Sequence, residues 1–466
     1  MVTTTNNKTG IDLSLDFANE LDAINYNTLS QEDITQIECL VLDHLGVCIR
    51  GSTLPWLEAL KSWGKKANGS GKSHIFGSNY KVSPSIASLI NATAAHGMEL
   101  DDTHDASVSH PGAVVISTAM AIGSSINSSS SDVTAAIVSG YETMGRIGRA
   151  TGAAEIIEHG FHPTALFGGF GAVSTAGKLL QLSPERLSRA WGLMLSMAGG
   201  SMQFSQDPLG TTVKRLHAGY GAHNGIMAAE FSKLGLDGPT QAFDGRYGLC
   251  KIFGIKPHLE SLKHTNDKLE IHEVSIKPYP CCRLFHSTID ALQQATENFN
   301  IPLNDIVNIN VGGPGILVDQ HMMRRPTSIM AAQYSLPFTL GASLVSGPSK
   351  YESFEEHNLN NNKILSVADK VSAMPDKELD RAFPTHFGSW VEVLTVNGPK
   401  KRIKILDSYG TPAKPMDINN VLEKIESLIQ QVPNFPNSNH IKENVEAFFS
   451  NPSASVLEFI EKVIKV

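Results

Sequence analysis

EHGFHPTALFGGFGAVSTAGKLLQLSPERL, residues 158–187, carries the clearest indication of the fold class. Small and apolar residues fill positions 164–180 with almost no charge, which predicts a helix buried on more than one face. A second helix follows at once. Ser183 is a favoured N-cap residue, Pro184 fits the first helical position, and Glu185 suits the positive end of the helix dipole. Two such helices in succession predict an interior helix bundle.

Helices of the same character extend in both directions from this stretch. Apolar residues recur close to the 3.6-residue period of a helix, and small residues allow close helix packing. The predicted helices span residues 33–50, 83–96, 112–125, 132–152, 164–180 and 183–202. The first 265 residues or so are therefore predicted to be helical.

The character of the sequence changes after about residue 265. Segments rich in Ile and Val predict strands, and helical segments lie between them, which indicates an α+β unit with helices on one side of a sheet. The predicted strands are 273–279, 306–312 and 391–397, and the helices are 284–299 and 328–345. Amphipathic helices return at 419–431, 441–449 and 454–466.

The predicted fold class is thus mainly α: a large all-helical part built from both chain ends, plus a smaller α+β part. The predicted domains are residues 1–265 (helical), 266–404 (α+β) and 405–466 (returning helices). A chain of 466 residues is also too long for one ordinary core, which favours two domains on length alone.

Composition and charge exclude several classes of protein. Hydrophobic residues make up 41% of the chain and charged residues 18%, as in globular proteins. No apolar run reaches the roughly 18–20 residues needed to span a bilayer. The net charge of −8 argues against binding to nucleic acid or to an anionic membrane. An anionic substrate would need a local cationic pocket.

The N-terminus and the cysteines predict a reducing, cytoplasmic location. MVTTTNNKTG lacks the apolar segment of a secretory signal, although organellar targeting is not excluded. The five cysteines are odd in number and widely spaced apart from one adjacent pair, unlike a disulfide framework. The sequence contains no C-x-x-C motif, so a structural zinc site is not expected.

The first chemical cluster is HGMELDDTHDASVSHPG, residues 96–112, with four carboxylates and three histidines in 15 residues. Such groups are costly to bury, so they need a function. One interpretation is a helix end capped by Asp102 or Thr103, with the rest in solvent. A metal site is another, but the spacing matches no named metal motif. The third interpretation is that these residues act in acid–base catalysis and position a substrate.

The second cluster surrounds His162. Pro163 disfavours a helical conformation at His162, so this imidazole is predicted to stand at a helix start. The free N–H groups there favour a bound carboxylate. A phosphate-binding loop is rejected, because its spacing has one residue too many and Leu179 stands where Ser or Thr is required. A core histidine is the alternative.

The third cluster, VKRLHAGY at 213–220, supplies the local cations that the acidic chain requires. Neighbouring residues on a helix diverge by about 100°, so Lys214 and Arg215 do not both face one pocket. Lys214 is predicted to point inward and Arg215 to form a structural salt bridge. A solvated helix face is the alternative.

The fourth cluster is KPYPCCRLFH, residues 277–286. Its two prolines predict an extended strand end, and a helix is predicted to start near Arg283. Strand-to-helix junctions favour ligand contacts. Cys281 or Cys282 as a nucleophile with His286 as its base lacks a supporting signature, and buried thiols are usually inert. A purely structural junction is the alternative.

Several segments in combination resemble the MmgE/PrpD family, which includes 2-methylcitrate dehydratase, cis-aconitate decarboxylase and iminodisuccinate epimerase. The segments are HGMELDDTHDASVSHPG, EHGFHPTALFGGFGAVSTAGKLLQL, TVKRLHAGYGAHNG, AFDGRYG and IKPYPCCRLFHSTIDA, and the resemblance runs from about residue 30 to 345. It implies a large helical domain made from both chain ends, a smaller α+β lid, a homodimer, and no metal or organic cofactor.

The resemblance also implies site residues. Matching the family motifs places the active site on Glu99, Asp102, Thr103, His110, His162 and Lys214. A further histidine is expected near the strand–helix junction and is predicted as His286, with the position of Cys282 as the alternative. The sequence departs from the family pattern at Glu99, where Asp is common, and in the longer spacing from Thr103 to His110. These departures leave the reaction within the family open.

The shared chemistry of the family is proton transfer at carbon beside a carboxylate, which histidine serves near neutral pH. His162 and His110 are predicted as the acid–base pair. The residues predicted to bind the substrate carboxylates are Lys214, Thr103, Lys277 and Arg283. Glu99 and Asp102 are predicted to orient the two histidines. His104 and His286 are predicted as further substrate-binding residues.

The leading prediction is a cofactor-independent lyase that decarboxylates a small polycarboxylic acid of the cis-aconitate type. The alternatives are a 2-methylcitrate-type dehydratase, an iminodisuccinate-type epimerase and a catalytically silent helical scaffold.

Overall fold

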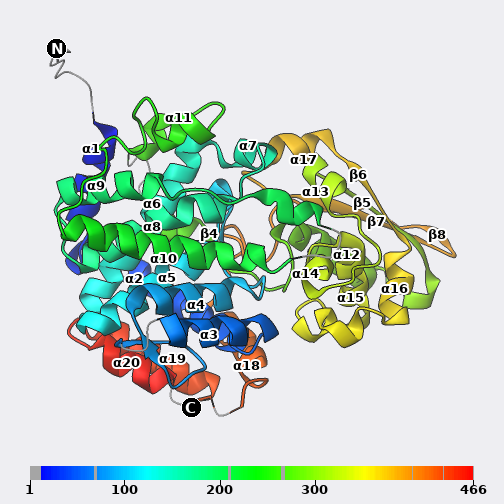
Figure 1. Ribbon diagram of the computed structural model, residues 1–466. Helices are drawn as coiled ribbons and strands as arrows, with labels where there is room; N and C mark the ends of the chain where they lie inside the picture. The colour runs from blue at the N-terminus through cyan, green and yellow to red at the C-terminus, as the bar shows by residue number, and fades with distance from the viewer. Residues whose placement is uncertain are drawn as a thin grey trace.

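A computed structural model describes residues 12–67, 71–207, 211–263, 268–400, 402–433 and 435–464 (Figure 1). The N-terminal segment 1–11, on which the targeting prediction depends, lies outside the described residues, as does the predicted domain boundary between 265 and 266. Within the described part of the chain, no helix is both long enough and apolar enough to cross a bilayer.

The helical part of the molecule is formed by both ends of the chain. Its helices are α1 (Leu13–Ala23), α2 (Gln31–Gly51), α3 (Pro55–Ala67), α4 (Pro84–His96), α5 (Pro111–Ile126), α6 (Ser130–Thr151), α7 (Ala153–Glu158), α8 (Pro163–Leu179), α9 (Pro184–Leu195), α10 (Val213–Lys233), α11 (Leu249–Phe253), α18 (Ile418–Ile429), α19 (Ser438–Ser450) and α20 (Val456–Val463). Short strands β1 (Ser73–His74), β2 (Lys81–Val82), β3 (Thr103–His104) and β4 (Val274–Ser275) accompany them. The predicted mainly-α fold class is confirmed.

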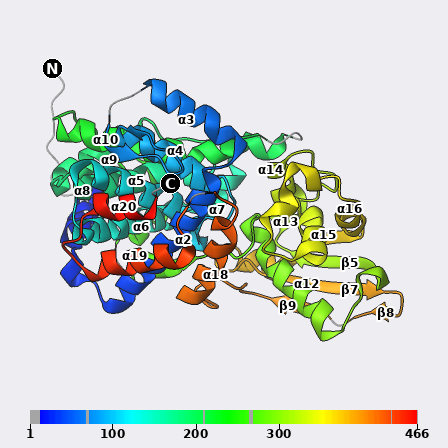
Figure 2. The ribbon, with the colours of Figure 1, turned by 90° about the horizontal axis from the view of Figure 1, so that it is seen from below.

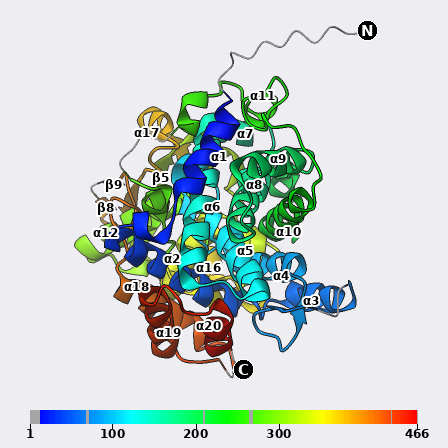
Figure 3. The same ribbon diagram turned by 90° about the vertical axis from the view of Figure 1, so that its left-hand side faces the viewer.

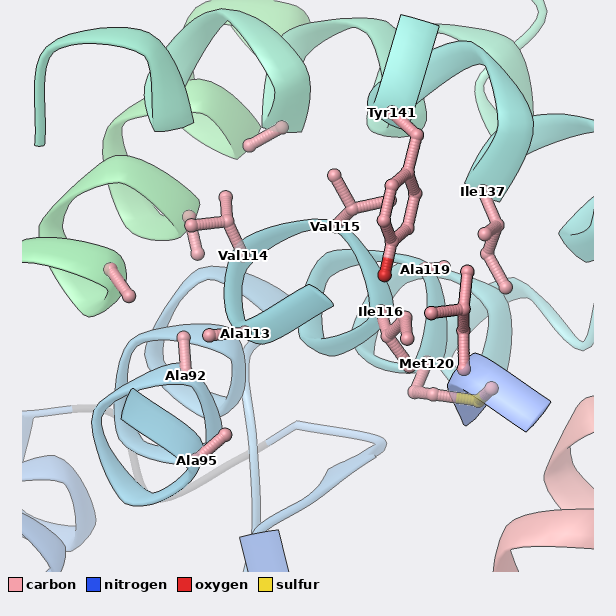
Figure 4. Close-up of a cluster of buried hydrophobic side chains, with 14 of the residues drawn as sticks. Ala92, Ala95, Ala113, Val114, Val115, Ile116, Ala119, Met120, Ile137 and Tyr141 are labelled. Atoms are coloured by element: carbon pink, nitrogen blue, oxygen red, sulfur yellow. The ribbon is translucent and has the colours of Figure 1, made fainter. Parts of the chain in front are cut away.

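Helix α8 lies inside this bundle, packed against α5, α6 and α10. Glycines make the closest approach, since a Cβ atom at Gly225 of α10 would lie 2.5 Å from the carbonyl oxygen of Gly169 in α8. Figure 4 shows the neighbouring core, where apolar side chains of α5 such as Ile116 and Met120 meet Ile137 of α6. The low charge of 164–180 is thus explained by burial on several faces.

The smaller part of the molecule is an α+β unit beside the bundle (Figure 2). It contains β5 (Ile306–Gly313), β6 (Val371–Pro375), β7 (Ser389–Thr395), β8 (Gly398–Pro399) and β9 (Ile403–Ile405), with α12 (His286–Asn298), α13 (Gly315–Gln320), α14 (Ile329–Gln333), α15 (Leu336–Ser346), α16 (Asn362–Ala368) and α17 (Lys377–Ala382). The strand order is β6-β5-β7-β8, with β9 also paired to β7. Among the strand pairs that the structure describes in this sheet, β5 and β6 are parallel and the others are antiparallel. A second apolar cluster fills this unit.

Three predicted elements differ from the structure. The helix predicted at 183–202 ends at Leu195, before the glycine pair Gly199 and Gly200. The helix predicted at 328–345 is divided into α14 and α15, because Ser335 starts a new helix as its N-cap. The strand predicted at 273–279 is reduced to β4, which pairs with β3 through Thr103 and Ser275. Two prolines after β4 remove the N–H groups that a longer ladder requires.

The returning C-terminal helices pack against the start of the chain. Figure 3 shows α18, α19 and α20 beneath α2, and α18 and α19 contact that helix. The Nζ atom of Lys424 in α18 lies 2.6 Å from Oδ1 of Asp43 in α2, and both side chains are buried. The same ammonium donates a hydrogen bond to the carbonyl oxygen of Leu100 at 2.8 Å. The predicted domain limits themselves stay a prediction.

Replacing Lys424 tests how strongly the C-terminal helices are anchored. Lys424→Met leaves Asp43 buried without its cation, so we expect the free energy of unfolding to fall by about 3–5 kcal/mol. Urea denaturation followed by circular dichroism measures the change. The control is Lys442→Met, which removes a partly exposed pair with Glu446 and should cost about 0.3–0.5 kcal/mol. Equal losses in the two variants would contradict the anchoring role.

Candidate active site

The loop that joins α4 to β3 carries the first acidic group of the site. Helix α4 ends at His96, and Glu99 then adopts a left-handed backbone conformation with φ of 54°. This conformation is uncommon for a residue with a Cβ atom and costs roughly 1–2 kcal/mol. Its contacts offset that cost, because Glu99 is only 1% exposed and faces two lysines from distant parts of the chain.

Two buried ammonium groups surround the Glu99 carboxylate. Lys214 of α10 binds its Oε1 atom directly. Lys277, two residues after β4, lies 3.6 Å from Oε2 and donates a hydrogen bond to the Glu99 carbonyl at 3.1 Å. Burial alone would raise the pKa of Glu99, but Lys214 and Lys277 outweigh it and lower this pKa. Glu99 is therefore an ionised group at the centre of a compact charge cluster.

Two histidines stand at helix starts beside this cluster. His110 is the N-cap residue of α5, followed by Pro111, and His162 is the N-cap residue of α8, followed by Pro163. The ring of His110 is held by a hydrogen bond from Nδ1 to the carbonyl oxygen of Asp102 at 2.9 Å. The helix start predicted at His162 is confirmed.

A third histidine lies between these two. The ring centroid of His96 is 5.0 Å from that of His110 and 5.8 Å from that of His162. Its Nδ1 atom is 2.7 Å from Oδ2 of Asp101, so the carboxylate orients the ring. Burial lowers the pKa of His96, of His110 and of His162 well below 6.5. All three rings are therefore neutral, and each has a lone pair that can accept a proton.

A single cavity brings most of the predicted residues together. It is lined by Glu99, Thr103, Val108, His110, Ile157, His162, Pro163, Met202, Phe204, Ser205, Lys277, Cys282, Arg283, Leu284, Ile316, Gln320, His321, Tyr334, Phe383 and Phe387. These residues come from both the helical bundle and the α+β unit. His110 and His162 thus share one chamber with two cationic side chains from the segment that follows β4.

Four predicted site residues do not line this cavity. Lys214 lies behind Glu99, with its ammonium 5.5 Å from the centre of the Tyr334 ring. Asp102 accepts hydrogen bonds from the Tyr141 hydroxyl at 2.6 Å and the Gly112 N–H at 2.8 Å. These bonds turn the Asp102 carboxylate into the bundle, so it acts on the site only through its carbonyl contact with His110.

His104 and His286 are the other two predicted site residues that do not line the cavity. His104 lies between Ser107 and Glu270, with Nε2 2.6 Å from the Glu270 carboxylate. His286 begins α12 and packs on the ring of Tyr279 at 5.1 Å. The cavity is instead lined by Cys282, the alternative position for the expected histidine. Burial raises the pKa of its thiol to about 11, which keeps it protonated.

Some residues at the cavity carried no local signal in the sequence. Phe204, His321 and Tyr334 reach it from segments outside the four clusters, and only the folded chain brings them together. Arg215 was expected to form a salt bridge, but none joins it to any residue that the structure describes. It hydrogen-bonds Gln333 at 3.2 Å and stacks on the Trp56 ring, because its neighbour Lys214 already binds the nearby carboxylate.

One group of side chains has the composition of a metal site. Donor atoms of His96, Asp101 and His110 lie within 4.8 Å of one another. However, the Lys277 ammonium already lies 4.0 Å from Asp101 Oδ1 and would repel a metal cation there. The group is therefore poorly suited to hold a metal cation, and cofactor independence stays a prediction.

Comparisons with known proteins identify a family and several relatives of this chain. Residues 15–261 match the model of the MmgE/PrpD N-terminal domain, and residues 279–447 match that of the MmgE/PrpD C-terminal domain. A cis-aconitate decarboxylase of Aspergillus terreus is 25% identical over 84% of this chain and 87% of its own. The human cis-aconitate decarboxylase is 27% identical over 76% of this chain and 75% of its own. The cis-aconitate decarboxylase-like protein oryM of Aspergillus oryzae is 26% identical over 73% and 75%.

The buried neutral histidines make stability sensitive to acid. Burial lowers the pKa of His321 to about 4 and, together with Lys214, that of His217 to about 4, whereas both would titrate near 6.5 in the unfolded chain. Between about pH 4 and 6.5 the unfolded chain binds more protons at these groups, so the free energy of unfolding falls as pH drops. Asp102 and Glu142 oppose this, since burial raises the pKa of each to about 7. The histidines with lowered pKa are more numerous: His44, His74, His96, His110, His162, His217, His286 and His321.

We expect the thermal unfolding midpoint to fall steadily from pH 7 to pH 5 at constant ionic strength. His321→Asn removes one buried titrating ring and should make the dependence shallower. The exposed residue His440 provides the control, since His440→Asn should leave the slope unchanged. A midpoint that stays constant or rises on acidification would show that the carboxyl groups dominate instead.

Proposed function

The chain belongs to the MmgE/PrpD family, and on this premise we propose that it is a lyase that decarboxylates cis-aconitate or a closely similar polycarboxylic acid. The names of its relatives support this choice of reaction. The observation that carries the proposal is the shared cavity, in which His110 and His162 face Lys277 and Arg283. That combination suits an acid–base reaction on an anionic substrate.

His162 and His110 are the proposed acid–base pair. Loss of CO2 from a substrate carboxylate leaves an electron pair on carbon, and an imidazolium must deliver the proton that completes the product. The rings are neutral in the free protein, because burial lowers the pKa of both. A bound polyanion favours the protonated form of a nearby imidazole, so substrate binding itself prepares the acid.

Cationic side chains and helix starts are the proposed carboxylate holders. Lys277 and Arg283 line the cavity, and α5 and α8 begin at the prolines directly after His110 and His162, where the positive ends of the helix dipoles favour an anion. Lys214 does not line the cavity, but it neutralises the Glu99 carboxylate, which would otherwise repel an anionic substrate. Thr103 adds a hydroxyl to the cavity wall. None of these roles requires a cofactor.

Proton NMR of the purified protein with cis-aconitate, citrate and 2-methylcitrate in separate tubes tests the proposal. We expect new vinylidene signals from cis-aconitate as CO2 is lost. His162→Ala should lower the rate roughly 10²–10⁴-fold, the usual contribution of an acid–base group. The matched control is His159→Ala, an exposed histidine three residues away, which should retain activity.

Other results of the same NMR experiment distinguish the dehydratase, epimerase and scaffold alternatives. An olefinic product from a hydroxy acid would make the protein a dehydratase and contradict decarboxylation. Inversion of an amino-diacid, with no reaction in the three tubes, would indicate the epimerase. A protein that neither binds nor converts any of these acids would be the silent scaffold.

We also propose a homodimer in the cytoplasm. All five cysteines are free, which suits a reducing compartment. Helix α10 exposes apolar side chains on one face, at Val213, Tyr220, Phe231 and Leu234. An exposed apolar stripe of this kind is typical of a subunit interface.

Sedimentation velocity checks the assembly. We expect the wild-type chain to sediment as a dimer and the double variant Tyr220→Asp, Leu234→Asp as a monomer, because two buried carboxylates would oppose association. The control places Asp at Trp63, an exposed residue on another helix, and should remain dimeric. A wild-type monomer at micromolar concentration would rule out the assembly.

A further inference from the structure

His217 is a histidine that the proposed reaction does not use, although it touches one that the reaction needs. It lies on α10, three residues after Lys214, so the two side chains project from the same side of the helix. Its Nδ1 atom is 3.0 Å from Nδ1 of His162, and the two ring centroids are 5.0 Å apart. His217 is 4% exposed and does not line the cavity.

The contact between the two Nδ1 atoms restricts where the protons lie. Burial lowers the pKa of His162 well below 6.5 and that of His217 to about 4, so both rings are neutral. A neutral imidazole carries its proton on one nitrogen only. A hydrogen bond between two Nδ1 atoms needs one donor and one acceptor, so the two rings must hold opposite tautomers.

We propose that His217 is a positioning residue: its Nδ1 accepts the Nδ1–H of His162 and thereby fixes Nε2 of His162 as the nitrogen that works in the cavity. The inference rests on the proposed acid–base role of His162. Among the residues that the structure describes, no group hydrogen-bonds Nε2 of His162, while the backbone N–H of His162 is held by the Gly200 carbonyl at 2.9 Å. The free nitrogen is thus the one available to a substrate.

This tautomer lets His162 work in both directions. With the proton on Nδ1, the lone pair on Nε2 accepts a proton and His162 becomes an imidazolium, while the bond to His217 is unchanged. Release of that proton to a carbanion restores the neutral ring. The opposite tautomer would have to become an imidazolate when it gave up its Nε2 proton, which is far less favourable.

The surroundings keep His217 neutral, as an acceptor must be. Phe204 packs edge-on against both rings, at 5.6 Å from His162 and 5.7 Å from His217, and this apolar cover limits competition from water. The Lys214 ammonium on the same helix, and the His96 ring from α4 beside His162, disfavour an additional positive charge at the pair. A neutral acceptor supports the imidazolium less than a carboxylate would, so His162 can still release its proton.

Steady-state kinetics of two substitutions test the role. His217→Leu fills the space without an acceptor, and we expect kcat to fall about 10- to 100-fold with KM within about twofold, the range that applies when a group orienting a metal-bound histidine is removed. His217→Asn restores a polar atom near the Nδ1 position and should recover most of kcat. His223→Leu is the control, on the same helix but bonded to the Ser85 carbonyl, and should match wild type.

Imidazole ¹⁵N NMR of the full-length protein tests the same inference without substrate. We expect His162 to be protonated on Nδ1 and unprotonated on Nε2, and His217 to show the reverse pattern. The variants His162→Ala and His217→Asn assign the signals. A His162 ring protonated on Nε2, or a His217→Leu variant with unchanged kcat, would overturn the inference. If the NMR spectra show the expected tautomers but the protein converts none of the three acids, the proposed function is wrong and the inference about the tautomers still holds.

Discussion

The charge cluster around Glu99 is the interaction on which the rest of the site depends. Its carboxylate binds Lys214 from α10 and Lys277 from the segment after β4, and all three side chains are at most 1% exposed. Losing the Glu99 carboxylate would leave two buried ammonium groups without their shared counter-charge, and uncompensated buried charge of this kind costs about 3–5 kcal/mol. This requirement holds a strained left-handed loop in place and joins the helical bundle to the start of the α+β unit.

The cluster also explains how an acidic protein can hold an anionic substrate. The net charge of −8 describes the whole chain, whereas the cavity is lined by Lys277, Arg283 and neutral histidines, with its one central carboxylate already neutralised. Two helices begin at the prolines directly after His110 and His162, so the positive ends of their dipoles lie beside the imidazoles. The acid–base groups and the anion-binding groups are therefore positioned by the same helix starts.

The sequence predicted what depends on neighbours in the chain and missed what depends on distant ones. Helix starts at His110 and His162 follow from the prolines beside them, so their place in the site could be predicted. The strand at 273–279 was overestimated, because the partner of β4 is the two-residue strand β3, some 170 residues earlier. The roles expected for His104 and His286 do not match their positions, since both rings are buried away from the cavity.

A crystal structure with tricarballylate, the saturated analogue of aconitate, tests the central claim most directly. This acid has three carboxylates but lacks the double bond, so it should occupy the cavity without reacting. We expect a bound molecule whose carboxylates contact Lys277, Arg283 and the N-terminus of α8, with Nε2 of His162 facing its carbon chain. An empty cavity at saturating ligand, or a ligand bound elsewhere on the protein, would contradict it.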